Sequence, residues 1–334
     1  MLVMQEDRGL LHALIGDGRP ALSLTAFALL VSGLFAIFLS FRREFLPHDV
    51  SYLGMTADEL CRFAECRVVR FMFHDRVAFG GTLVAIAVFY LWLAAFPLRE
   101  RAAWAWWAFA ASGLLGFGSF LAYLGYGYLD AWHGAATLAL LPTFAIGLLV
   151  SRRLATEPSV VWIRTAGTVG LPRSLRVGRY GLLATGLGIA LAGLVILYLG
   201  STEVFVAEDL AFMGVDRQML DAVNPRLIPL IAHDRAGFGG GLATIGVLLV
   251  LCAAYSPPRR SFHETVVLAG GAGFGCAIGT HFVEGYVNPV HLAPAFAGAA
   301  LFAVSIISEI IGARTFAARG LTAAVAGEQR TQKR

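Results

Sequence analysis

Long apolar runs alternate with short polar segments along most of this chain. Eight of the runs have the roughly 20 residues that a helix needs to cross a bilayer. They cover residues 21–41, 77–97, 104–124, 132–151, 180–200, 236–255, 264–283 and 290–312. The pattern predicts an all-α integral membrane protein with eight transmembrane helices.

One motif occurs twice, about half the chain apart. It reads HDRVAFGG from His74 and HDRAGFGG from His233, and each copy opens an apolar run. Three further matches keep the same order: Asp49 with Asp209, Gly116-Phe117-Gly118 with Gly273-Phe274-Gly275, and Gly127-Tyr128 before His133 with Gly285-Tyr286 before His291. Each half therefore holds four spans, and an even number places the two halves parallel in the membrane.

The repeat defines the expected organisation of the chain. We expect two parallel tandem four-helix bundles, formed by an N-terminal repeat at 1–151 and a C-terminal repeat at 180–312. A cytoplasmic linker at 152–179, with Pro158 and Pro172, joins the two repeats. A polar cytoplasmic tail follows at 313–334.

Composition and charge support a membrane location. The chain of 334 residues is 57% hydrophobic and 14% charged, whereas soluble domains carry roughly 25% charged residues. No basic run is interleaved with aromatic residues, so no nucleic-acid partner is expected. Nearly all basic residues are arginine. This bias is typical of GC-rich bacterial genomes, so we expect a bacterial inner-membrane protein.

The distribution of arginine predicts the topology. Most Lys and Arg residues lie in segments on the same side of the membrane as both termini. By the positive-inside rule, both termini are therefore cytoplasmic, and the loops 43–73 and 201–232 face outward. Cys61 and Cys66 share the first of these outer loops, where a disulfide is expected.

Four histidines are the strongest candidates for chemistry. His74 and His233 lie at the outer ends of the second and sixth spans, and His133 and His291 at the outer ends of the fourth and eighth. Each half thus has two histidines at one membrane depth. Imidazoles that face each other across a bundle are suited to axial ligation of a b-type haem. The alternative is that these histidines only hydrate helix ends.

Glycines follow three of these histidines at a spacing of seven. Gly81, Gly240 and Gly298 should lie about two turns deeper on the same helix face. They could leave room for a flat macrocycle, or they could serve close helix packing. After His133 the matching residue is Leu140, so the C-terminal pocket is expected to be the more open one.

Charged residues accompany the histidines. Arg76 and Arg235 could pair with haem propionates. Asp75 and Asp234 could neutralise these arginines or orient an imidazole. Alternatively, each Asp–Arg pair is a solvated marker of a helix start.

Other polar candidates lie near the outer ends of the spans. Asp49 and Asp209 lie in the outer loops and are interpreted as loop-folding caps or, alternatively, substrate contacts. His281 and Glu284 occur only in the second half. Because ionisable residues near a span are functional candidates, these two indicate that the halves have diverged.

The overall pattern resembles heme A synthase. The resemblance rests on two parallel four-helix halves, the histidine at the outer end of the second and fourth helix of each half, and the cysteine pair. It implies that His74 and His133 serve an N-terminal haem site, that His233 and His291 serve a C-terminal one, and that Cys61 and Cys66 form the loop pair. The sequence departs from the family's Glu-x-x-His-Arg signature, with Phe71 and Leu230 at the glutamate positions.

Three functions from different classes are compatible with the sequence. The first is a membrane oxidoreductase that binds haem b in its C-terminal pocket and uses a quinone or another redox partner. The second is a two-repeat transporter, in which Pro142 and Pro294 bend helices. The third is a non-catalytic assembly protein. The lipid bilayer is a partner in all three, and the sequence does not determine the oligomeric state.

Overall fold

The computed structural model describes residues 9–10, 15–121, 124–125, 128, 131–158 and 171–331. Eight long helices account for most of this part of the chain, and no strand occurs in it. They are α2 (Arg19–Phe41), α5 (Arg67–Ala95), α6 (Ala103–Leu121), α7 (Ala131–Ser151), α9 (Arg173–Ser201), α12 (Leu227–Tyr255), α13 (Arg260–Glu284) and α14 (Pro289–Thr331).

Seven of these helices are long and apolar enough to cross a membrane. The exception is α6, because its three tryptophans and its glycines and serines lower its hydropathy. It nevertheless occupies the position of the third predicted span. The predicted linker is shorter than expected, since the 3₁₀ turn η3 (Arg152–Leu154) extends α7 and α9 already begins at Arg173. Residues 159–170 of the linker lie outside the described residues.

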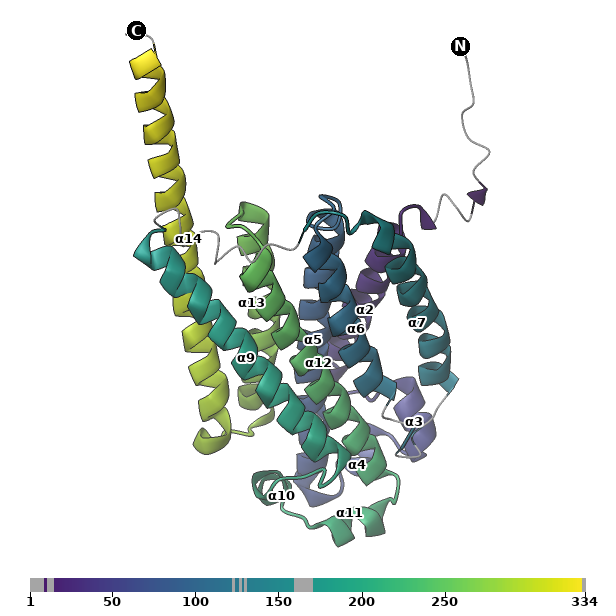
Figure 1. The fold of residues 1–334 in the computed structure, drawn as a ribbon. Coiled ribbons are helices and arrows are strands. Elements are labelled where there is room, and N and C mark those ends of the chain that lie inside the picture. The colour runs from purple at the N-terminus through teal and green to yellow at the C-terminus, as the bar shows by residue number, and fades with distance from the viewer. Residues whose placement is uncertain are drawn as a thin grey trace.

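Helices α5 and α12 form the centre of the molecule (Figure 1). About 72% of their most apolar window is buried, against 17–33% for the other spanning helices. The other six helices surround this pair. Each helix contacts the next in the closed order α2, α5, α13, α14, α9, α12, α6, α7 and back to α2. The two central helices belong to this ring and also contact each other across it.

This ring mixes the two sequence halves. The second helix of each half packs against the third helix of the other half, as α5 does on α13 and α12 does on α6. The halves are therefore not two separate packing units, although equivalent helices make equivalent contacts. The central helices must be apolar on most sides, and this is why α5 and α12 show no strong polar face.

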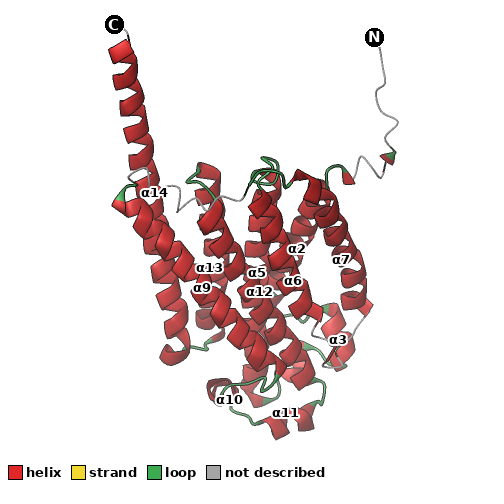
Figure 2. Cartoon of the chain, in the orientation of Figure 1, coloured by secondary structure: helices red, strands yellow, loops and turns green. Residues whose placement is uncertain are grey.

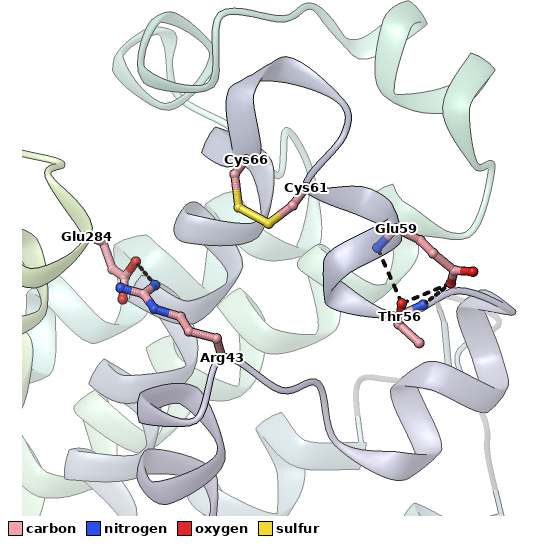
Figure 3. The surroundings of a disulfide bond; sticks show 6 residues. All are labelled: Arg43, Thr56, Glu59, Cys61, Cys66 and Glu284. Carbon is pink, nitrogen blue, oxygen red and sulfur yellow. Dashed lines mark hydrogen bonds and ion pairs between the residues drawn. A yellow bond between two sulfur atoms is a disulfide. The ribbon is translucent and has the colours of Figure 1, made fainter.

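Four short helices cover one end of the bundle. They are α3 (Pro47–Leu53), α4 (Ala57–Leu60), α10 (Ala207–Met213) and α11 (Arg217–Val223), and they lie opposite the start of α2 and the end of α14 (Figures 1 and 2). The polar sequence positions their ends. Thr56 and Glu59 form a capping box on α4 (Figure 3), and Gly54 and Gly214 end α3 and α10 at φ 68°, where glycine avoids a Cβ clash.

The outer loop of the first half contains a disulfide. Cys61 and Cys66, the pair expected from the sequence, are bonded where α4 leads through the 3₁₀ turn η1 (Ala64–Cys66) into α5 (Figure 3). The two loops also contact each other. The Asn224 side chain donates to the Leu53 carbonyl oxygen at 2.9 Å, and the Arg226 guanidinium donates to the Tyr52 carbonyl oxygen at 2.6 Å.

Candidate functional site

The repeated His-Asp-Arg triplets lie inside helices, at the end of the bundle that the loops cover. α5 begins at Arg67 and α12 at Leu227, about two turns before His74 and His233. The alternative interpretation, in which these triplets are solvated charge pairs at a helix start, is therefore wrong. The triplet of α5 is wholly buried, whereas in α12 His233 is buried and Asp234 and Arg235 are slightly exposed.

Arg76 is held by carboxylates from both halves. It lies 2.7 Å from Asp49 of its own half and 3.1 Å from Asp234 of the other half. Arg76 and Asp49 are almost fully buried. Two carboxylates therefore already neutralise the cation that was expected to bind a haem propionate.

Arg235 repeats this arrangement in the other half. It contacts Asp209 of its own half and lies 3.4 Å from Asp75 of the other half. The aspartate of each triplet thus reaches the arginine of the other triplet. Asp49 and Asp209, interpreted from the sequence as loop caps or substrate contacts, are the outer members of this buried network, and Asp209 also accepts from the Val206 amide as a cap.

A cluster of three histidines lies beside this network. His74 of α5, His281 of α13 and His291 of α14 each offer a ligand atom, and the three atoms lie within 4.8 Å of one another. The Nε2 atoms of His74 and His281 are 3.0 Å apart. This arrangement could hold a metal ion.

The hydrogen-bond partners of Nδ1 define the tautomer of two of these histidines. His74 Nδ1 lies 3.0 Å from Asp75 Oδ1, and His281 Nδ1 lies 2.9 Å from the Tyr286 carbonyl oxygen. Both partners are acceptors, so each Nδ1 carries the hydrogen and each Nε2 presents a lone pair. In neutral imidazoles two lone pairs then face each other at 3.0 Å, an arrangement that a shared cation, either a proton or a metal ion, would stabilise.

Tyr286 orients the third histidine. Its hydroxyl donates to Asp209 at 2.8 Å and lies 3.5 Å from His291 Nδ1. Burial and the adjacent Asp209 carboxylate raise the pKa of the Tyr286 phenol, so it remains a protonated donor. Towards His291 the same oxygen can then accept from Nδ1, and in a neutral imidazole this leaves Nε2 available to coordinate.

The second histidine cluster is formed by residues of α3, α7 and α12. His133 of α7 and His233 of α12 approach to 3.1 Å between Nε2 atoms. The ring of His48 from α3 lies 4.8 Å from that of His133, centroid to centroid. The Tyr128 ring lies edge-on to His133 and tilted against His233, and its hydroxyl donates to Asp49, as that of Tyr286 does to Asp209.

The observed pairing of histidines corrects the expected one. His74 does not pair with His133, and His233 does not pair with His291; each triplet histidine meets the fourth helix of the other half. The cause is the mixed ring, in which α5 lies against α13 and α12 against α6. The C-terminal pocket expected from His233 and His291 is therefore not assembled.

Two of the three spaced glycines serve close packing. A Cβ on Gly240 would lie 1.8 Å from Ser119 Oγ, and one on Gly81 would lie 2.4 Å from the Cβ of Cys276. The space expected for a macrocycle is thus occupied by the neighbouring helix. Leu140 does not close the N-terminal side, because it lines a cavity of about 670 Å³ beside His133 and His233.

Gly240→Ala should lower stability by roughly 1–3 kcal/mol, the usual cost of overpacking a tight contact. Gly298→Ala is the matched control, because its Cβ would meet Phe274 at an ordinary 3.4 Å. Thermal unfolding of both variants in detergent checks this expectation. Equal unfolding temperatures would show that Gly240 does not serve packing.

The remaining candidates have separate places. His281 joins the His74 cluster, whereas Glu284 pairs with Arg43 at the base of the loops (Figure 3). Sequence reasoning missed Tyr128, Tyr286 and His48 as parts of the histidine clusters. Both tyrosines belong to repeated Gly-Tyr dipeptides, and that repetition is the signal that could have identified them.

The comparisons with known proteins return no relative. No family model matches the chain, and no curated protein or solved structure matches it either. The two histidine clusters are therefore the features that bear on function.

Proposed function

We propose that this chain is a multi-pass membrane protein that binds one first-row transition-metal ion through His74, His281 and His291. The observation that carries the proposal is the convergence of three imidazole ligand atoms within 4.8 Å of one another, with the Nε2 atoms of His74 and His281 only 3.0 Å apart. The acceptors that fix the Nδ1 hydrogens, Asp75 and the Tyr286 carbonyl, match the outer-shell partners that metal-binding histidines commonly use.

The separation of the Nε2 atoms discriminates between a metal ion and haem. With metal–nitrogen bonds of about 2.0–2.1 Å, neighbouring ligands of one ion lie ~2.9–3.3 Å apart, and opposite ligands lie ~4 Å apart. The observed 3.0 Å between the Nε2 atoms of His74 and His281 therefore fits neighbouring ligands, and the 3.1 Å between those of His133 and His233 is likewise shorter than the separation of opposite ligands. These distances do not fit a haem iron held between two imidazoles. We therefore propose a metal ion in place of the haem b expected from the sequence.

Three imidazoles leave at least one coordination position open. Catalytic sites keep such a position for water or substrate, and imidazole suits zinc, copper, iron and nickel. The site therefore supports a metal-dependent membrane enzyme or redox protein. The redox function expected from the sequence would then depend on a metal ion held by His74, His281 and His291.

The proposal includes a membrane arrangement of eight spans in two parallel repeats. Support comes from α6, which lies in the ring between α12 and α7, as α13 lies between α5 and α14. An eight-helix arrangement also leaves α2 and α14 starting and ending at the same end of the bundle (Figure 1).

We expect both termini to face the cytoplasm of a bacterium. Single cysteines at Asp58 and Asp216, in the capping loops, should react with a membrane-impermeant maleimide added to intact spheroplasts, in a background with serine at the native cysteines. A cysteine introduced in the polar tail should react only after lysis. The reverse pattern would place the histidine clusters at the cytoplasmic face.

Metal analysis of the purified protein tests the proposal. The protein is expressed with zinc, copper and iron in the medium, purified in detergent without a histidine tag, and analysed by inductively coupled plasma mass spectrometry. About one equivalent of a single transition metal per chain is expected, with no Soret band. Metal at background level, even after titration with Zn²⁺ and Cu²⁺, would overturn the proposal.

A further inference from the structure

The cavity beside His133 and His233 has the size of a small-molecule site. Its volume of about 670 Å³ lies within the 300–1,000 Å³ typical of ligand pockets. It is bounded by α2, α3, α5, α6, α7 and α12. Four of these helices, α2, α3, α6 and α7, come from the first half of the chain and lie outside the central pair. The proposed metal ligands His281 and His291 come instead from α13 and α14.

The cavity opens on the lipid-facing side of the bundle. Three apolar lining residues of the outer helices are well exposed, Val31 by 49%, Phe35 by 47% and Trp132 by 66%. They belong to α2 and α7, two of the outer helices. In a membrane protein, apolar side chains on this surface face lipid, so a ligand could enter from the bilayer.

The cavity has an apolar part and a polar end. Leucine, valine, isoleucine and phenylalanine side chains of α2, α5, α6 and α7 line most of it. The polar end is formed by His48, Asp49, Arg76, His133, His233 and Asp234. Such a cavity fits an amphiphile whose head reaches the histidines and whose chain extends towards lipid.

The polar end favours a neutral hydrogen-bond acceptor. Arg76 is 2% exposed, and its Nη1 atom is buried without a hydrogen-bond partner. A buried donor without a partner costs free energy, so an acceptor from a ligand would be stabilising there. Asp49 and Asp234 already pair with Arg76 at 2.7 Å and 3.1 Å, so an added carboxylate or phosphate would gain little from its charge.

Aromatic side chains favour a planar head group. Phe79, Phe117, Phe120 and Trp132 line the cavity together with the imidazoles. Aromatic faces and edges pack favourably against a flat ring. A linear acyl chain with a carboxylate head would use neither these rings nor the neutral acceptor site.

We propose that this cavity binds an isoprenoid quinone, with a ring carbonyl accepting from Arg76 and the isoprenoid chain leaving between α2 and α7. The site is separate from the three-histidine metal site and does not depend on it. Failure of the metal proposal therefore leaves this one intact, and the reverse also holds.

Binding of decylubiquinone to the full-length protein in nanodiscs tests the inference. Saturable binding is expected, measured by titration calorimetry. Ala136 lines the cavity on α7, whereas its neighbour Ala135 is exposed and does not line it. Ala136→Phe should weaken binding at least tenfold, and the matched control Ala135→Phe should leave it unchanged. Leu140→Trp fills the same space from the next turn and serves as a second blocking variant.

Two readouts keep the result interpretable. An unchanged thermal unfolding temperature shows that each variant is folded. Oleate, an anionic single-chain lipid, should not displace decylubiquinone. The inference is overturned if the wild type shows no saturable binding, if both blocking variants bind as the wild type does, or if oleate displaces the quinone at equal concentration.

Discussion

Replacing His281 with alanine should remove most of the bound metal. Loss of an outer-shell partner commonly costs 10–100-fold in metal affinity, so loss of one of three ligands should cost at least ~10-fold. The His281 Nε2 atom lies 3.0 Å from that of His74. The substitution leaves His74 and His291 as only two ligands, too few to hold the ion against exchange with buffer.

The control for this prediction is on the same helix. His263 also belongs to α13 but lies at its other end, where its Nε2 atom is 3.7 Å from Glu309. His263→Asn should keep the metal at full occupancy. Mass spectrometry of both purified variants and a competitive Zn²⁺ titration give the comparison. Equal metal content in the His281→Ala variant and the wild type would contradict the ligand assignment.

Replacing Arg179 with methionine should destabilise the protein by about 3–5 kcal/mol. That is the usual cost of removing one partner of a buried ion pair. Arg179 of α9 contacts Glu309 of α14, and both side chains are fully buried. Arg179 also donates to the carbonyl oxygens of Ala253 at 2.9 Å and Ser256 at 2.7 Å. The variant leaves the Glu309 carboxylate without its cation.

A double variant separates the charge from the packing. Because replacing both partners with apolar residues of similar size is often close to neutral, Arg179→Met with Glu309→Leu should recover much of the loss. Unfolding in mixed micelles with increasing sodium dodecyl sulfate measures the three free energies. A single variant as stable as the wild type would show that the ion pair contributes little.

The helical framework followed from local properties of the sequence. Apolar runs of about 20 residues predicted the long helices, because a helix that faces lipid needs apolar side chains along its length. Seven of them satisfy the criteria for a span. The two copies of the His-Asp-Arg triplet lie in the two central helices, α5 and α12. These features depend on neighbours in sequence, so they could be read directly.

The partners of each polar residue depended on long-range packing. His74 meets His281 across 207 positions, and Arg76 meets Asp234 across 158. Within one half, His74 and His133 had equally good spacing and depth, so the sequence contained no preference between the two pairings. The contact of α5 with α13, and of α12 with α6, made the choice.

The glycines show the same difference between what local sequence predicts and what long-range packing decides. A spacing of seven correctly placed Gly240 on a helix face below His233, because helix geometry is local. Whether that face borders a ligand or another helix depends on which helix lies opposite, and Ser119 of α6 lies there. The sequence by itself thus determined the long helices and the histidines near their polar end. The tertiary structure alone decided which of those residues meet, because contacts between distant helices are selected by the packing of the whole ring.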